Sequence, residues 1–212
     1  MPKSPTKRRP ATVAALTESA LALFAERGFH ATSISDIVQQ AGLTRGAFYS
    51  NFQDKEELFL ALYDAHTDRL LAELREQVAA FTDDPDPLAR MFDQLATHDA
   101  RERSWFLVSM EFTLHAARHP ETARALAEHE ERLNAGLAEL LARGLESAGH
   151  TPEVSPTTLA RLVVALFEGL TAMRVTHTAK DTATDPAPLA RRALPHLVRA
   201  LSTPHGSPGT PQ

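Results

Sequence analysis

The chain has 212 residues, enough to bury a hydrophobic core without the help of disulfide bonds or metal sites. It contains no cysteine, which excludes a disulfide framework, and no apolar run reaches the roughly 20 residues that cross a bilayer. The first residues also lack the apolar core of a signal peptide. We therefore expect a soluble, cytoplasmic protein with no membrane partner.

Charge is distributed unevenly along the chain. The formal net charge is −5, which by itself argues against a nucleic-acid partner. Residues 1–55, however, carry seven basic and four acidic side chains, a net charge of +3, so the remainder carries −8. A basic end on an acidic body favours a phosphate-binding surface at that end, although a basic tail can also be simply solvated.

Helical periodicity dominates the chain. Apolar residues recur at steps of three and four, and no convincing stretch alternates with a period of two between hairpin turns, so we predict an all-α fold. The first helix covers residues 12–27 and ends at Gly28. The later helices are predicted at residues 33–41, 44–51, 55–81, 87–98, 102–118, 121–147, 157–178 and 187–202.

The segment 32–52 contains two short helices joined by a tight turn. Ser33 and Asp36 form a capping pair at the start of the first helix, and Thr44 caps the second. Gly42 between them can adopt the left-handed conformation that ends a helix and turns the chain. Such a pair is a helix-turn-helix, whose second helix enters the major groove of DNA.

This segment resembles the DNA-binding domain of the TetR family, over about residues 10–60. The residues that match the family pattern are Thr32, Asp36, Ile37, Ala41, Gly42, Gly46, Tyr49, Phe52, Lys55 and Leu58. Asn51 departs from it, because the family often has His there, but Asn can also donate to a phosphate. The resemblance implies a one-component transcriptional regulator, more often a repressor, that binds a pseudo-palindromic operator as a homodimer.

Roles on DNA follow from residue type and from the resemblance. Arg45 is the candidate for reading guanine, with a phosphate contact or a solvated side chain as alternatives. Gly46 costs a helix about 1 kcal/mol relative to Ala, which favours a close approach of DNA to the backbone. The resemblance implies phosphate contacts from Thr32, Ser33, Thr44, Tyr49, Asn51 and Lys55.

Three further features of this end have alternative interpretations. Lys55 lies in the first turn of a helix, where it can hold a phosphate together with free backbone N–H groups or can be a solvated cation beside two glutamates. Phe48 and Phe52 alternate with the polar positions and are predicted to be core. The basic residues 7–9 belong to an arm that either lies near the minor groove or is disordered.

The resemblance also divides the chain into segments. These are a basic disordered arm (1–10), a helix-turn-helix domain (11–54), a helical effector-binding and dimerisation domain (55–202) that begins with a connecting helix (55–81), and a disordered tail (203–212). The apolar helices 157–178 and 187–202 are predicted to form the dimer interface; intramolecular core is the alternative.

Large apolar side chains concentrate in the second half of the chain. They are predicted to line a cavity for a lipophilic or aromatic effector, although each alone could be core. The predicted lining residues are Met91, Phe92, Trp105, Phe106, Met110, Phe112 and Phe167.

Two other functions stay open. The first is a DNA-binding regulator without a small-molecule ligand. The second is a helical metal-binding enzyme, because Glu111, His115 and His119 recur at steps of four on one helix face, although Arg118 beside them would repel a cation. No nucleophile–base pair or phosphate loop is recognisable, so we predict no enzymatic activity and no cofactor.

Overall fold

The computed structural model describes residues 8–80, 89–90, 92–93, 100–176 and 187–204. Nearly all of these residues are helical, which confirms the predicted all-α class. The chain divides into two compact units, one made of residues 1–68 and 100–129, the other of residues 69–99 and 130–212. Met91 and most of the predicted helix 87–98 lie outside the described residues.

The first unit contains α1 (Arg8–Arg27), α2 (Ile34–Gln40), α3 (Arg45–Tyr49) and α6 (Ala100–Ala116). It also takes the first part of α4 (Lys55–Ala80) and of α7 (Pro120–Ser147). The sequence placed a domain boundary at residue 55, but the first turns of α4 belong to this unit. The reason is that their apolar face is buried with α1, α2 and α3 in one cluster.

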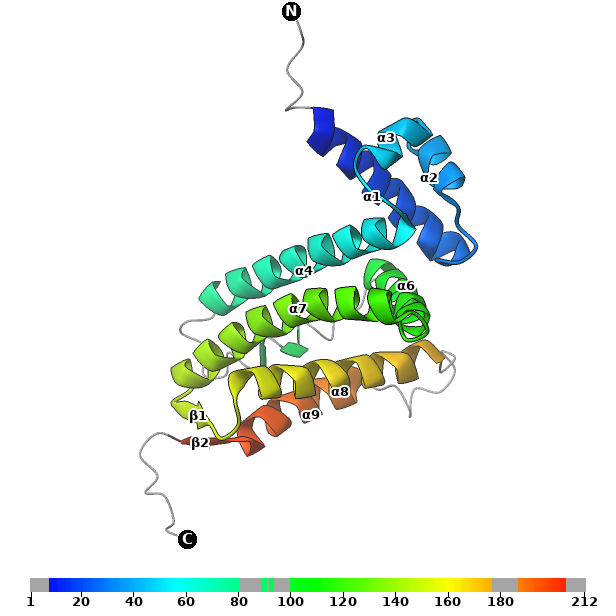
Figure 1. Ribbon diagram of the computed structural model, residues 1–212. Helices are drawn as coiled ribbons and strands as arrows, with labels where there is room; N and C mark the ends of the chain where they lie inside the picture. Colours follow the sequence, from blue (N-terminus) through cyan, green and yellow to red (C-terminus); the bar gives the residue numbers. More distant parts are fainter. Residues whose placement is uncertain (1–7, 81–88, 91, 94–99, 177–186, 205–212) are drawn as a thin grey trace, which may run out of the picture. The chain divides into compact units, whose positions relative to one another are not determined.

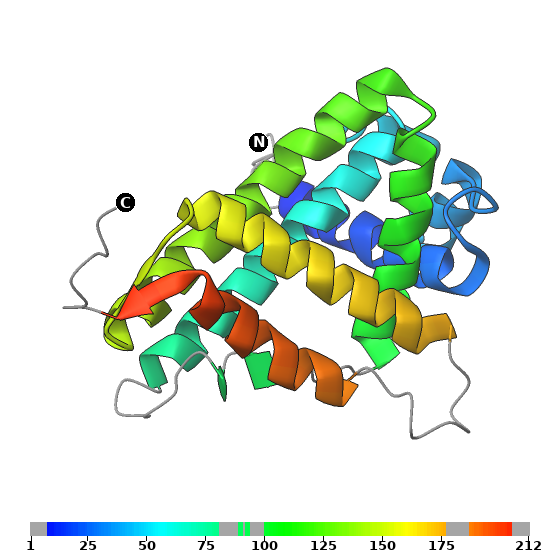
Figure 2. The same ribbon diagram turned by 90° about the horizontal axis from the view of Figure 1, so that it is seen from below.

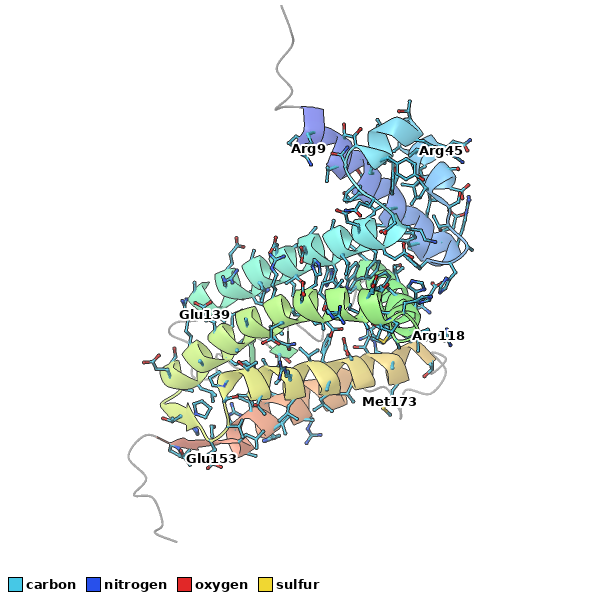
Figure 3. All side chains as sticks on the ribbon, in the orientation of Figure 1. Arg9, Arg45, Arg118, Glu139, Glu153 and Met173 are labelled. Carbon is cyan, nitrogen blue, oxygen red and sulfur yellow. The ribbon has the colours of Figure 1, made fainter. Side chains whose placement is uncertain are left out.

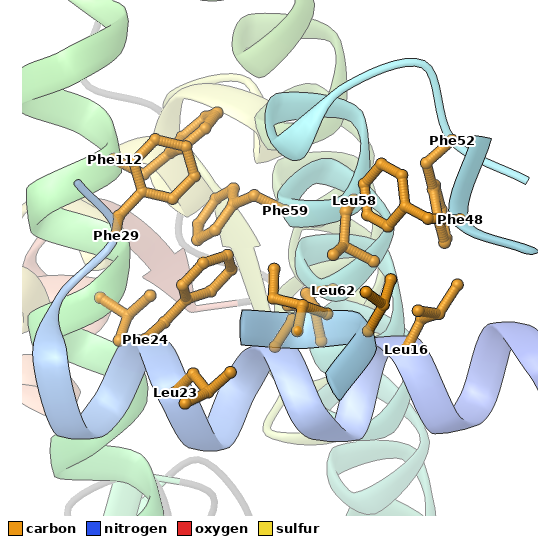
Figure 4. Close-up of a cluster of buried hydrophobic side chains, with 14 of the residues drawn as sticks. Leu16, Leu23, Phe24, Phe29, Phe48, Phe52, Leu58, Phe59, Leu62 and Phe112 are labelled. Atoms are coloured by element: carbon orange, nitrogen blue, oxygen red, sulfur yellow. The ribbon is translucent and has the colours of Figure 1, made fainter. Parts of the chain in front are cut away.

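Aromatic rings fill the centre of the first unit (Figure 4). The rings of Phe59 and Phe112 are stacked with centroids 3.8 Å apart, and Phe29 packs edge-on against Phe112 at 5.1 Å. A second part of the cluster packs Phe48 and Phe52 near Leu58, as Figure 4 shows. Because these rings come from α3, α4, α6 and the turn after α1, their burial holds the short helices in place.

The second unit contains α8 (Pro156–Thr176), α9 (Ala187–Ala200) and the remaining parts of α4 and α7. Helices α8 and α9 pack against each other, side by side in both Figure 1 and Figure 2. The core of this unit is aliphatic apart from Phe92. Its fully buried members include Leu74, Phe92, Leu141, Leu145, Leu159, Leu194 and Val198.

A small sheet was not predicted. Strand β1 (His150–Pro152) pairs antiparallel with β2 (Ser202–Pro204) just after α9. Three-residue strands are too short to show a period of two, so the sequence carries no signal for this pair. Thr203 and Pro204 therefore belong to β2 rather than to a disordered tail, whose residues 205–212 lie outside the described part.

The N-terminal arm is also shorter than expected. Residues 8–10 belong to α1, although the sequence assigned them to a disordered segment. Pro10 does not prevent this, because the first turn of a helix has no intrahelical partner for its N–H groups.

Candidate nucleic-acid interface

Helix α2 begins and ends as its sequence predicts. The Ser33 Oγ accepts a hydrogen bond from the Asp36 N–H at 3.2 Å, and the Asp36 carboxylate accepts one from the Ser33 N–H at 2.9 Å, which completes a capping box. The Ser33 hydroxyl also donates to the Asp36 carboxylate at 2.5 Å, and this bond, followed by the one from the Ser33 N–H, holds the pKa of Asp36 below its ordinary value. At the other end Gly42 has φ +64°, and Leu43 N–H donates to the Val38 carbonyl at 2.8 Å.

Helix α3 is short, and only one of its faces is buried. Thr44 is its N-cap, whose Oγ1 accepts from Ala47 N–H at 3.2 Å. Phe48 is fully buried and Phe52 nearly so, as predicted, with ring centroids 5.8 Å apart. Tyr49, by contrast, is 58% exposed. The outer face of α3 is therefore formed by Thr44, Arg45, Gly46 and Tyr49, all exposed in the structure.

Arg45 is held by the helix before it. One guanidinium nitrogen, Nη2, donates to the Ser35 Oγ on α2. This bond uses one of the five N–H donors of the guanidinium, and the remaining four are available to a ligand. Figure 3 shows Arg45 on the helix-turn-helix segment. The contact with Ser35 could not be predicted from the sequence, because the two residues are ten positions apart and no local pattern links them.

Gly46 has free space beside it. A Cβ built on Gly46 would meet only the Thr44 Oγ1, at 3.7 Å, which is an ordinary van der Waals distance. The fold of this unit therefore gives no steric reason for a glycine at this position.

The turn between α1 and α2 is bound from two sides. Glu111 of α6 accepts hydrogen bonds from the N–H groups of Phe29 at 2.8 Å and His30 at 3.1 Å. Lys55 at the start of α4 donates through Nζ to the carbonyls of Phe29 at 2.6 Å and Thr32 at 2.9 Å. We call this arrangement the turn clamp. Its long-range partners carry no local sequence signal, so the sequence analysis missed it.

A glycine is required where the turn begins. Gly28 has φ +85°, and a Cβ there would lie 2.8 Å from a Glu111 carboxylate oxygen. Both the backbone conformation and the carboxylate therefore exclude a larger residue.

Three predicted phosphate ligands make bonds within the chain instead of facing outward. Lys55 lies 4.2 Å over the Phe29 ring, and burial lowers the pKa of its ammonium. Thr32 is buried, with its Oγ1 donating to the Gly28 carbonyl at 2.8 Å. Asn51 donates to the Ala47 carbonyl at 2.8 Å. Ser33, Thr44, Arg45, Gly46 and Tyr49 remain at the surface.

The predicted effector-lining residues are divided between the two cores. Phe112 is fully buried in the aromatic cluster of the first unit, and Phe92 in the core of the second, against which Phe167 packs. Trp105 stacks at 4.2 Å on His66 and at 5.9 Å on Phe59. The remaining two described members, Phe106 and Met110 of α6, are half-buried.

The alternative metal site is not assembled in the described residues. No group of three His, Cys, Asp or Glu side chains there has metal-binding geometry. The Glu111 carboxylate, the expected first ligand, is already engaged by the turn clamp. No helix among these residues is both long and apolar enough to cross a membrane.

Comparisons with known proteins agree with this architecture. Residues 16–62 match the model of the bacterial regulatory proteins of the tetR family, and residues 85–201 match the C-terminal model of the BetI-type transcriptional repressor. The HTH-type transcriptional repressor Rv1474c of Mycobacterium tuberculosis is 26% identical over 172 residues, which cover 81% of this chain and 87% of that protein.

Other similarities are shorter or concern the fold alone. The HTH-type transcriptional activator FasR of Mycolicibacterium smegmatis is 30% identical over 82 residues, 37% of each chain. The structure of Salmonella enterica GusR superposes with a TM-score of 0.67 at 22% identity, covering 94% of this chain and 98% of that one. With two family models matched along its length, the chain belongs to the TetR family of transcriptional regulators.

Proposed function

We propose that this protein is a repressor that binds a pseudo-palindromic operator as a homodimer through the outer face of α3. The observation that carries the proposal is the division of α3 itself. Phe48 is buried, whereas Arg45, Gly46 and Tyr49 are exposed. Both ends of the helix are capped by hydrogen bonds. In a dimer, two such helices would enter major grooves about 34 Å apart.

Arg45 is proposed to read guanine. A guanidinium contacts O6 and N7 of guanine with two parallel donors, and the Ser35 hydroxyl would keep the side chain extended toward the groove. Ser33, Thr44 and Tyr49 are also exposed and would contact phosphates, which set the register of the helix on DNA.

Selection of bound sequences from a random DNA pool tests the operator proposal. We expect a pseudo-palindromic site, and Arg45→Ala should weaken its binding by about 1–3 kcal/mol and relax the preference at one guanine per half-site. Arg143→Ala, at an exposed arginine of α7, is the matched control and should leave binding unchanged. Recovery of no palindrome would refute the proposal.

Gly46→Ala separates folding from DNA binding. Alanine fits the space beside Gly46 and is about 1 kcal/mol better in a helix, so the free energy of unfolding in urea should stay the same or rise. The added methyl group faces the proposed DNA surface, so operator affinity should fall. Unchanged affinity in a stably folded variant would show that DNA does not approach this backbone closely.

Lys55 offers a choice between a phosphate contact and a structural role. Since its ammonium is bound to two carbonyls, we expect Lys55→Met to lower the free energy of unfolding by about 1–3 kcal/mol. The salt dependence of operator binding should keep its slope, because losing one phosphate contact from each protomer of the dimer would reduce that slope by about 1.8. A reduced slope with unchanged stability would restore the phosphate role.

The dimer is proposed to form through α8 together with α9. Leu162 and Met173 are 43% and 47% exposed and stand three helical turns apart on α8. Leu166 and Gly169 lie between them on the same face of α8, and we call these four residues the α8 stripe. Leu166 is half-buried, and a Cβ built on Gly169 would have no neighbour within 4 Å among the described residues. Figure 3 labels Met173 toward the end of this helix. An exposed apolar stripe with a small residue at its centre suits close packing against a second helix.

Leu162→Glu tests this interface. A charge in the stripe should shift sedimentation equilibrium toward monomer and weaken operator binding in parallel. Leu107→Glu, at a leucine that is 41% exposed on α6, is the matched control. If both variants stayed dimeric, the α8 stripe would not be the interface.

A small lipophilic or aromatic effector is proposed to release the operator. Support comes from the half-buried apolar side chains of α6, namely Trp105, Phe106 and Met110, since Phe92 and Phe112 are already fully buried as core. Helix α4 is the proposed transmitting element, and the coupling free energy would be about 1–3 kcal/mol in each direction. Screening aromatic compounds for release of operator DNA tests whether the protein responds to such an effector.

A further inference from the structure

Three histidine rings gather beside the turn clamp. His30 belongs to the turn itself, His115 to α6, and His119 to the connection between α6 and α7. The ring centroids of His30 and His115 are 5.0 Å apart, and those of His115 and His119 are 4.2 Å apart. We call these residues the histidine cluster. Neither the fold nor the proposed DNA contacts explain three imidazoles at this place.

The middle ring is held in its neutral form. The Nε2 of His115 lies 3.3 Å from a Glu56 carboxylate oxygen, and the side chain is only 11% exposed. A carboxylate accepts, so Nε2 carries the hydrogen and Nδ1 is the nitrogen that a further proton would join. That Nδ1 is buried and has no hydrogen-bond partner among the described residues. A proton added there would be a buried donor without an acceptor, which is unfavourable.

Burial and the neighbouring histidines also disfavour the protonated form of His115. Burial first, then His119, and then His30 lower the pKa of His115, while Glu56 opposes them. Lys55 and Glu111 face the same turn in the clamp. The folded contact therefore has its full stability above the ordinary histidine value of 6.5 and loses it as the pH falls below that value toward the lowered pKa.

We propose that the histidine cluster is a proton-responsive contact: while neutral it keeps the turn before α2 packed on α6, and acidification loosens the helix-turn-helix and weakens operator binding. The turn is the covalent entry to α2, and α6 binds it through the Glu111 carboxylate directly beside the rings. Protonated imidazoles at 4.2 and 5.0 Å repel one another, and separating them moves His30 and the turn backbone together. This inference rests on the proposed operator binding.

The test follows operator affinity from pH 8.0 to pH 5.5 by fluorescence anisotropy, at constant ionic strength, with the full-length protein and its selected operator. His115→Gln keeps a donor toward Glu56 but cannot be protonated. Over this range we expect the wild-type protein to lose about fivefold or more affinity relative to His115→Gln, the lower end of the usual coupling between two linked sites. His150→Gln, at a half-buried histidine of β1 outside the proposed DNA surface and the proposed dimer helices, should follow the wild-type profile.

A second variant guards against a folding defect in the first. His30→Gln changes an exposed ring, and it should also flatten the pH profile because it removes one of the repelling charges. NMR titration of the histidine ring protons, without DNA, should show His115 titrating below the ordinary histidine value of 6.5. Parallel affinity profiles for the wild type and both variants would overturn the inference. Absence of operator binding already at pH 8.0 would instead overturn the proposed function.

Discussion

The backbone of residues 28–32 is the constraint on which the DNA-binding end depends. Polar backbone groups beside a hydrophobic core are costly to leave without partners, and this turn satisfies only the Gly28 carbonyl from within, through the Thr32 hydroxyl. Glu111 takes the N–H groups and Lys55 takes the carbonyls, so two helices that are distant in sequence bind the same few atoms. The angle at which the chain enters α2 is thereby set by α4 and α6 rather than by local propensity.

The aromatic core and the turn clamp act on the same residue. Phe29 supplies a ring to the centre of the first unit and backbone groups to both partners of the clamp, and the Lys55 ammonium rests on the face of that ring. Packing and polar contacts are thus coupled at one position. A change in α6 that moves Phe112 or Glu111 therefore acts directly on Phe29 and on the turn before α2.

Local chemistry could be predicted from the sequence and long-range chemistry could not. The capping box of α2, the Thr44 cap and the left-handed Gly42 each depend on residues within a few positions, and the structure has all three. Lys55 was expected at a phosphate, because the sequence shows the start of a helix but not the carbonyls more than twenty residues away that bind it. The strand pair β1–β2 was missed because fifty residues separate its halves.

The exposed residues of α3 can be substituted without disturbing the fold. In α3 only Phe48 is buried, and the caps at its two ends do not use the side chains of Arg45 or Tyr49. Substitutions at Arg45 or Tyr49 therefore alter the surface without opening a cavity. After a gene duplication, the exposed residues of α3 could therefore diverge between the two copies while selection for folding stayed unchanged.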